Sequence, residues 1–132
     1  MSDPVSSPSV FVASIGGYMG RSYSVEKMGN GLEYRRYDSG FELRQVRLIH
    51  PGEEDWVAFR QALDEIGVWE WRSDYTDPGI LDGTNWGLEI RWGDRAISTG
   101  GSNGYPGGSY RSRTFTAFLE AVSKLVGGRP FS

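Results

Sequence analysis

Residues 85–97 read NWGLEIRWGDRAI, and this stretch decides the fold. Apolar side chains alternate with small or polar ones over residues 86–92, which is the period of a strand with one buried face. Gly93-Asp94 then suits a two-residue turn of the kind that has Gly first. Such a turn places Ile90 opposite Ile97 on the same face. The stretch therefore predicts an antiparallel hairpin that packs on a hydrophobic core.

Four further strands are expected at residues 9–15, 22–28, 32–37 and 41–49, and a short one at 68–71. The first is apolar on consecutive positions, as in a strand covered on both faces or a buried connection. Asn30-Gly31 suits a tight hairpin turn, because both residues tolerate positive φ. In 41–49 the apolar residues change parity near Arg44 and Gln45, which predicts a bulge that kinks the strand.

Two helices are expected, one at each of two stretches with a helical repeat of apolar residues. The first follows Pro51-Gly52, carries three acids in its opening turn, repeats Trp56, Phe59, Leu63 and Ile66, and ends at Gly67. The second starts at Ser112 or Thr114, repeats apolar residues up to Val126, and stops at Gly127-Gly128. Each apolar stripe needs a sheet to cover it.

Strands joined by short turns leave little room for parallel crossovers. The predicted fold class is therefore α+β, with an antiparallel sheet of about five to seven strands and two helices packed on one face. Residues 1–8 are expected to form a flexible leader and residues 9–132 a single α+β domain.

Composition removes several classes of site. The chain of 132 residues has no Cys and one His, His50, which excludes thiol nucleophiles, disulfides and Cys/His zinc clusters. No apolar run is long enough to cross a bilayer, and the N-terminus carries no basic secretory segment. We therefore expect a cytoplasmic protein. Twelve of the fourteen basic residues are Arg, which indicates GC-rich bacterial coding.

Charge is unevenly distributed along the chain. The formal net charge is −3, but residues 53–94 hold eleven acids and three Arg. This acidic block is interpreted either as solvated carboxylates or as a surface that steers a basic partner. Arg and Tyr interleave on the strands at 22–47, as single-stranded nucleic acid would require, but Glu26, Glu33 and Glu42 on the same strands favour a salt-bridged face instead.

The motifs that could mark a catalytic or a metal site match known patterns only in part. Residues 100–104 match the G-x-S-x-G pattern of a nucleophilic Ser, which would make Ser102 a hydrolase nucleophile. No helix starts directly after it, however, and His50 precedes it, contrary to the order in that fold. Asp74, Asp77, Asp82 and Glu89 invite a calcium or magnesium ion, yet half the ligand positions of an EF-hand are missing, so no metal is assigned. No cofactor is implied, and we expect a noncatalytic protein.

Two loops carry the remaining signal, at residues 72–84 and 100–111. Aromatic platforms beside Asp and Asn are what peptides and sugars bind to. The candidate binding residues of these loops and of the preceding segment are Trp69, Trp71, Asp74, Tyr75, Asp77, Asp82, Asn103, Tyr105 and Tyr110.

Over residues 69–118 these loops lie within a distinctive order of motifs. It runs Trp69-x-Trp71, Tyr75, Asp82-Gly83-Thr84-Asn85-Trp86-x-Leu88-x-Ile90, Gly101-Ser102-Asn103-Gly104-Tyr105-Pro106 and Phe115-x-x-Phe118. This order resembles a pattern of small uncharacterised bacterial domains. The resemblance implies that the two loops and the Trp86 strand belong to one unit, and it implies no activity. Residues 106–110 depart from it by being longer than the pattern.

Two functions follow as hypotheses. In the first, the loops meet and present an acidic and aromatic surface to a protein partner, in particular a basic one, as an immunity protein or inhibitor does. In the second, the same loops hold a small molecule or saccharide in a concave pocket walled by Trp69 or Trp71. Both require the two loops to lie side by side.

Overall fold

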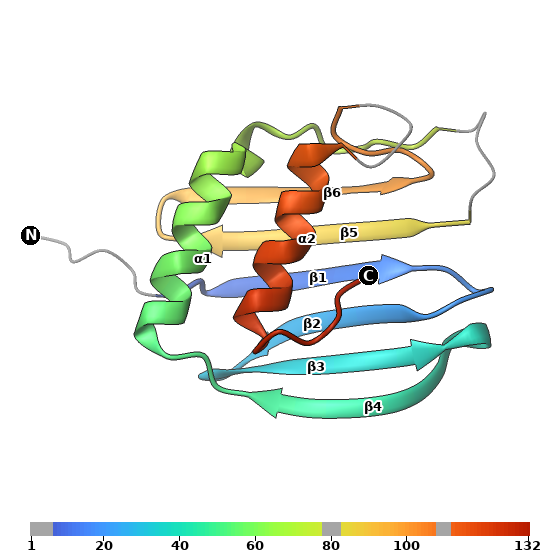
Figure 1. The fold of residues 1–132 in the computed structure, drawn as a ribbon. Coiled ribbons are helices and arrows are strands. Elements are labelled where there is room, and N and C mark those ends of the chain that lie inside the picture. The colour runs from blue at the N-terminus through green and yellow to red at the C-terminus, as the bar shows by residue number, and fades with distance from the viewer. Residues whose placement is uncertain (1–6, 78–82, 108–111) are drawn as a thin grey trace, which may run out of the picture.

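A computed structural model describes residues 7–77, 83–107 and 112–132 of the chain. Its centre is a six-stranded antiparallel sheet in the order β4-β3-β2-β1-β5-β6 (Figure 1). The strands are β1 (Val10–Gly16), β2 (Ser22–Met28), β3 (Gly31–Asp38), β4 (Glu42–Ile49), β5 (Asn85–Trp92) and β6 (Arg95–Ser102). The predicted α+β class and strand number are confirmed.

Two helices cover one face of the sheet, side by side and crossing the strands (Figure 1). They are α1 (Glu53–Ile66) and α2 (Arg113–Leu125), with short 3-10 turns η1 (Ser39–Phe41) and η2 (Val68–Glu70). α1 ends at Gly67, as expected. The φ of Gly67 is 78°, a left-handed conformation that glycine adopts without strain because it has no Cβ. Ser112, and not Thr114, caps α2 by accepting a hydrogen bond from the backbone N–H of Phe115.

The core lies between the sheet and the helices. In each inner strand alternate side chains point into it, and in β5 these are Trp86, Leu88, Ile90 and Trp92. Phe59 of α1 packs on Phe11 and Trp92, and Phe115 of α2 packs on Trp86. The opposite face of the sheet carries no helix in the described part of the chain.

Register predictions hold at two places. In the β5–β6 hairpin Ile90 pairs with Ile97 across Gly93-Asp94. Between β3 and β4 the register shifts at Arg36/Tyr37, which confirms a bulge near Arg44. The β2–β3 turn was misplaced by one residue, because Met28 pairs with Gly31 and the turn is therefore Gly29-Asn30.

Three other expectations were wrong. Residues 68–71 form no strand: residues 68–70 are the 3-10 turn η2 and Trp71 ends it, because Gly67, with a φ of 78°, turns the chain directly after α1. β1 is covered on one face only, with Ser14 exposed on the other. β6 continues to Ser102, so it includes the first residues of the expected glycine loop.

The chain termini add two observations. Of the expected leader, the structure describes only residues 7 and 8, and Pro8 is buried. At the other end, Phe131 is buried against Tyr23, and the Tyr34 hydroxyl donates to the Pro130 carbonyl. Among the described residues, no helix is long and apolar enough to cross a membrane.

Candidate functional site

The segment at residues 72–77 runs along the outer edge of β6. The N–H of Tyr75 donates to the Gly100 carbonyl, and the N–H of Asp77 donates to the Ser102 carbonyl, both at 2.9 Å. The Thr99 hydroxyl also donates to the Arg72 carbonyl. These bonds occupy the end of the outer β6 edge, at residues 99–102, and hold the acidic segment against the sheet.

The loop that follows β6, at residues 103–107, contacts the 72–84 loop and the start of β5. The N–H of Asn103 donates to the Thr84 carbonyl at 2.9 Å, and the Trp86 indole donates to the Gly104 carbonyl at 2.8 Å. Gly104 passes so near that a Cβ there would lie 1.8 Å from the Tyr75 carbonyl oxygen. The two loops are therefore adjacent at one edge of the sheet, and glycine is required for that contact.

Of the candidate residues in these loops, Asp74 is the most available. It is exposed, and its carboxylate accepts hydrogen bonds from the backbone and hydroxyl of Thr76. Tyr75 and Asp77 are half-buried. Tyr75 packs on Trp86 at 6.0 Å, and the Arg72 guanidinium lies 4.6 Å from its ring centre. Asp82 and Tyr110 lie outside the described residues.

The aromatic candidates divide into buried and accessible rings. Tyr105 is only 3% exposed and packs on Phe115 at 4.9 Å, so the expectation of a loop-exposed ring is wrong. Trp71 is half-buried against Phe118 and Trp86. Trp69 is half-buried, and its indole N–H donates to Asp64 at 2.7 Å. Asn103 is also half-buried, with a φ of 59° that few non-glycine residues adopt.

Around these rings, acidic side chains follow the chain from the end of α1 to the 72–77 segment. We name Asp64, Glu65, Glu70, Asp74 and Asp77 the acidic edge; Arg72 is the only basic residue at 64–77. η2, which follows the end of α1, also contacts β6. The backbone that carries Glu70, Asp74 and Asp77 therefore runs beside β6.

Asp64 is the member that sequence reasoning missed. Desolvation acts to raise the pKa of its carboxyl, but hydrogen bonds from Trp69 and Arg60, with the Arg60 charge, lower the pKa below its ordinary value. The Arg60 guanidinium in turn lies over the Trp69 and Trp92 rings. The spacing of Arg60 and Asp64 by one helical turn was the available signal.

Ser102 has a structural position. It pairs with Asn85 in the β5–β6 ladder, and its carbonyl accepts the Asp77 N–H. His50 follows β4 at the opposite edge of the sheet, beside Gly31. Because neighbouring strands are about 4.8 Å apart, five strand spacings separate the two residues by more than about 20 Å. They form no nucleophile–base pair, so the hydrolase hypothesis loses its geometric basis.

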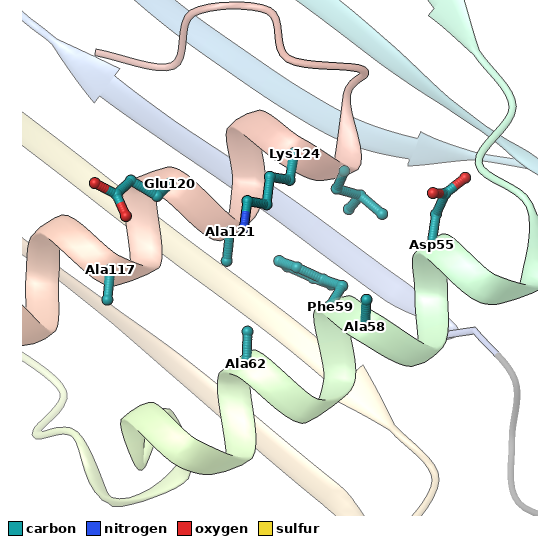
Figure 2. A pocket seen from close by; sticks show the side chains of 9 residues that line it. Asp55, Ala58, Phe59, Ala62, Ala117, Glu120, Ala121 and Lys124 are labelled. Carbon is teal, nitrogen blue, oxygen red and sulfur yellow. The ribbon is translucent and has the colours of Figure 1, made fainter.

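Several grooves are lined by described residues. The one between α1 and α2 has a volume of about 310 Å³, and Figure 2 shows Ala58 and Ala62 of one helix facing Ala117 and Ala121 of the other. Asp55, Glu120 and Lys124 stand at its rim. Neither Trp69 nor Trp71 lines this groove, the groove beside Ser14 and Tyr37, the groove beside Tyr18 and Thr84, or the groove beside Glu53 and Gln61. The walls expected for a saccharide pocket are therefore absent from these grooves.

No group of three His, Asp or Glu side chains within the described ranges is arranged to hold a metal ion. No protein-family model matches the chain. No curated protein matches it closely enough to count as a relative.

Proposed function

We propose that the protein is a noncatalytic binding module that recognises a basic protein through its acidic edge. The observation that carries the proposal is the pairing of residues 72–77 with β6, since it attaches the exposed carboxylate of Asp74 to a rigid sheet. A surface held in one conformation loses little conformational entropy when a partner binds. A bacterial cytoplasmic setting is part of the proposal, supported by the Arg-rich composition.

Electrostatics favours a basic partner. Residues 64–77 carry five acids and one Arg, a net charge of −4, whereas residues 21–50 carry a net charge of +2. A charge gradient across a small domain orients an approaching partner and raises the association rate, and salt screens both effects. The proposal therefore predicts binding that weakens with ionic strength, mainly through slower association.

Two half-buried aromatic rings beside the carboxylates provide contact area. Trp69 is fixed by Asp64 and Arg60, and Tyr75 is fixed by Arg72 and Trp86. Trp, Tyr and Arg dominate the binding energy of many interfaces, because they bury a large area with few freely rotating bonds. The proposed surface therefore combines charge for steering with rings for affinity.

Capture of partners from a GC-rich bacterial lysate at low and high salt tests the proposal. The tagged protein is compared with a Glu70→Gln/Asp74→Asn double variant and with a Glu26→Gln/Glu89→Gln control. Both pairs remove two exposed carboxylates, but the control pair lies on the uncovered sheet face. Asn at position 74 keeps an oxygen acceptor for Thr76.

We expect a basic protein to be retained at low salt by the parent and the control, and to be lost from the acidic-edge variant. With the purified partner, the loss should be about tenfold or more in Kd, the effect of about 0.7 kcal/mol per carboxylate. Equal binding by both double variants, or no salt-sensitive partner, would contradict the proposal.

A further inference from the structure

β4 forms the sheet edge farthest from the acidic edge, and among the described strands it pairs with β3 alone (Figure 1). Three large apolar side chains stand exposed along it: Leu43 at 46%, Val46 at 43% and Leu48 at 62%. An exposed edge strand with apolar side chains is a ready template for another strand. Nothing in the acidic-edge proposal uses this surface.

The bulge places the three apolar side chains on one face. Leu43, Val46 and Leu48 pair with Tyr37, Arg35 and Glu33, which are alternate residues of β3. Residues paired across an antiparallel ladder share a face, so all three point away from the helices. Without the extra residue, Arg44, the odd and even positions would divide Leu43 from the other two.

The other face of β4 carries Glu42, Gln45, Arg47 and Ile49, and Glu42 is already paired with Arg44 at 3.3 Å. Gln45 and Arg47 pair with Arg36 and Tyr34, which places them on the helix-bearing side of the sheet. Neither Arg36 nor Arg47 forms an ion pair with a described acid, and the Arg36 Nε is buried without a hydrogen-bond partner. The positive charges of Arg36 and Arg129 act to lower the pKa of the neighbouring Tyr34 phenol, against the larger effect of its burial. This positive charge lacks a counter-ion within the described chain.

We propose that β4 accepts an extended segment of an acidic partner protein as a seventh strand of the sheet. Main-chain hydrogen bonds along the free edge would provide affinity, and the alternation of β4 would select the sequence. The segment would carry apolar side chains against Leu43, Val46 and Leu48, and carboxylates on the other face against Arg47 and Arg36. Strand addition matches both faces of β4 with one alternating pattern.

A second copy of the chain fits less well. A symmetric antiparallel pair of β4 strands centred on Val46 or on Arg47, near the middle of the strand, keeps the two faces aligned. The first choice brings Arg47 to Gln45 of the other copy, and the second brings Arg47 to Arg47. Either arrangement gathers unpaired guanidinium groups from both copies on one face, and like charges across a ladder are destabilising. Charge therefore favours a different, acidic chain.

An aromatic corner extends the surface beyond the start of β4. Tyr18 and Phe41 meet edge to face at 5.7 Å, and they are 64% and 55% exposed. Phe41 has a φ of 56°, and the adjacent Gly40 N–H is bound to the Tyr18 carbonyl. A backbone strained to expose an aromatic ring fits a recognition role. We assign this corner to a bulky apolar residue at one end of the added strand.

The experiment uses the full chain and a short acetylated peptide in which Val and Glu alternate, with a Val/Lys peptide of the same pattern as its counterpart. Backbone amide shifts in ¹⁵N spectra report where each peptide binds. Arg47→Glu tests the charged face and Leu48→Lys tests the apolar face. Arg91→Glu and Val57→Lys are the matched controls, because these exposed residues lie on β5 and α1. Near-ultraviolet circular dichroism establishes that each variant is folded.

We expect the Val/Glu peptide to shift the amides of β4 and of residues 18–21, with Arg47→Glu and Leu48→Lys each weakening binding about tenfold and the controls within about twofold. Acidic-edge variants should bind the peptide as the parent does, so the two proposals fail independently. No binding at millimolar peptide, shifts confined to other strands, equal binding of the Val/Lys peptide, or a dimer in solution that Leu48→Lys dissociates would each overturn the assignment. Should Leu48→Lys fail to fold, Arg47→Glu alone decides.

Discussion

The backbone N–H of Tyr75 lies 2.9 Å from the carbonyl oxygen of Gly100, and this bond joins two loops that are 25 positions apart in the chain. It makes the 72–77 segment an extension of the sheet at the β6 edge. The carboxylates of the acidic edge therefore depend on backbone geometry as much as on their own side chains.

Gly104→Ala should separate the two loops. Its new Cβ would lie 1.8 Å from the Tyr75 carbonyl oxygen and 2.8 Å from the Tyr75 carbonyl carbon, both backbone atoms that cannot rotate away. We expect a loss of about 2 to 3 kcal/mol in the free energy of unfolding, as for other overpacked sites. Urea denaturation followed by Trp fluorescence measures it.

Gly20→Ala is the control for that substitution, because a Cβ there meets no atom within 4 Å. Its unfolding free energy should stay within about 0.5 kcal/mol of the parent value. A Gly104→Ala protein as stable as the Gly20→Ala protein would mean that the loops do not touch as described.

Tyr34→Phe should release the C-terminal tail. The hydroxyl donates to the Pro130 carbonyl at 2.6 Å, and its loss should cost about 1 kcal/mol. Burial, followed by the nearby Tyr23, raises the pKa of Tyr34 above the ordinary 10.0. The neutral phenol thus contributes stability that is complete below pH 10 and is lost as the pH rises toward the raised pKa. Denaturation between pH 8 and 11 should show a shallower alkaline decline in the variant; Tyr18→Phe should keep the parent profile.

Asp64→Asn should remove an acid-dependent contribution. The hydrogen bonds from Trp69 and Arg60 outweigh desolvation and hold the pKa of Asp64 below 3.8. A carboxyl whose pKa is lower in the folded state than in the unfolded state stabilises the fold at pH values above the unfolded-state pKa. This contribution is lost as the pH falls through the folded-state pKa. Because the carboxylate is half exposed, the loss at pH 7 should be below about 1 kcal/mol.

The diagnostic measurement for Asp64→Asn is the difference in unfolding free energy from the parent at pH 7 and at pH 3, which should shrink at the lower pH. Glu65→Gln on the same helix turn should show no such change. A difference that is the same at both pH values would indicate a packing effect and not an ionic one.

Ser112→Ala should destabilise α2 at its N-terminus. The Ser112 hydroxyl accepts from the Phe115 N–H at 3.1 Å and donates to the Pro106 carbonyl at 2.6 Å. Removal of such a cap costs about 1 kcal/mol. Ser112→Asp keeps the acceptor for Phe115 and should recover part of that loss in thermal unfolding. An alanine variant as stable as the parent would show that the cap contributes nothing.

Local patterning explains why much of the fold was predictable. The alternation in β5 and the turn at Gly93-Asp94 specify both the face and the register of that hairpin. A shift by one residue would expose both indoles of β5, Trp86 and Trp92. The parity change in β4 required an extra residue for the same reason, and the bulge lies there. Helix ends were readable from caps and glycines, which act within one turn.

The site was less predictable, since long-range contacts decide exposure. Tyr105 lies between glycine and proline in a loop, yet Phe115 of α2 covers it. Residues 68–71 contain Val and Trp, which favour strands, yet Gly67 directs the chain into a 3-10 turn. The hydrogen bond between Asp64 and Trp69 could not be predicted, because the two residues lie on different elements, α1 and η2.

By itself the amino-acid sequence determined the two helices, the six strands of the sheet, its antiparallel class and the acidic character of residues 53–94, because periodicity, turn chemistry and charge are local properties. Only the tertiary structure decided that residues 72–77 pair with β6, that Ser102 and His50 lie at opposite edges, and that β4 is left with an apolar face and with Arg47 on the other. Strand order sets these relationships. It depends on the burial of apolar area over the whole chain, which no local window of sequence contains.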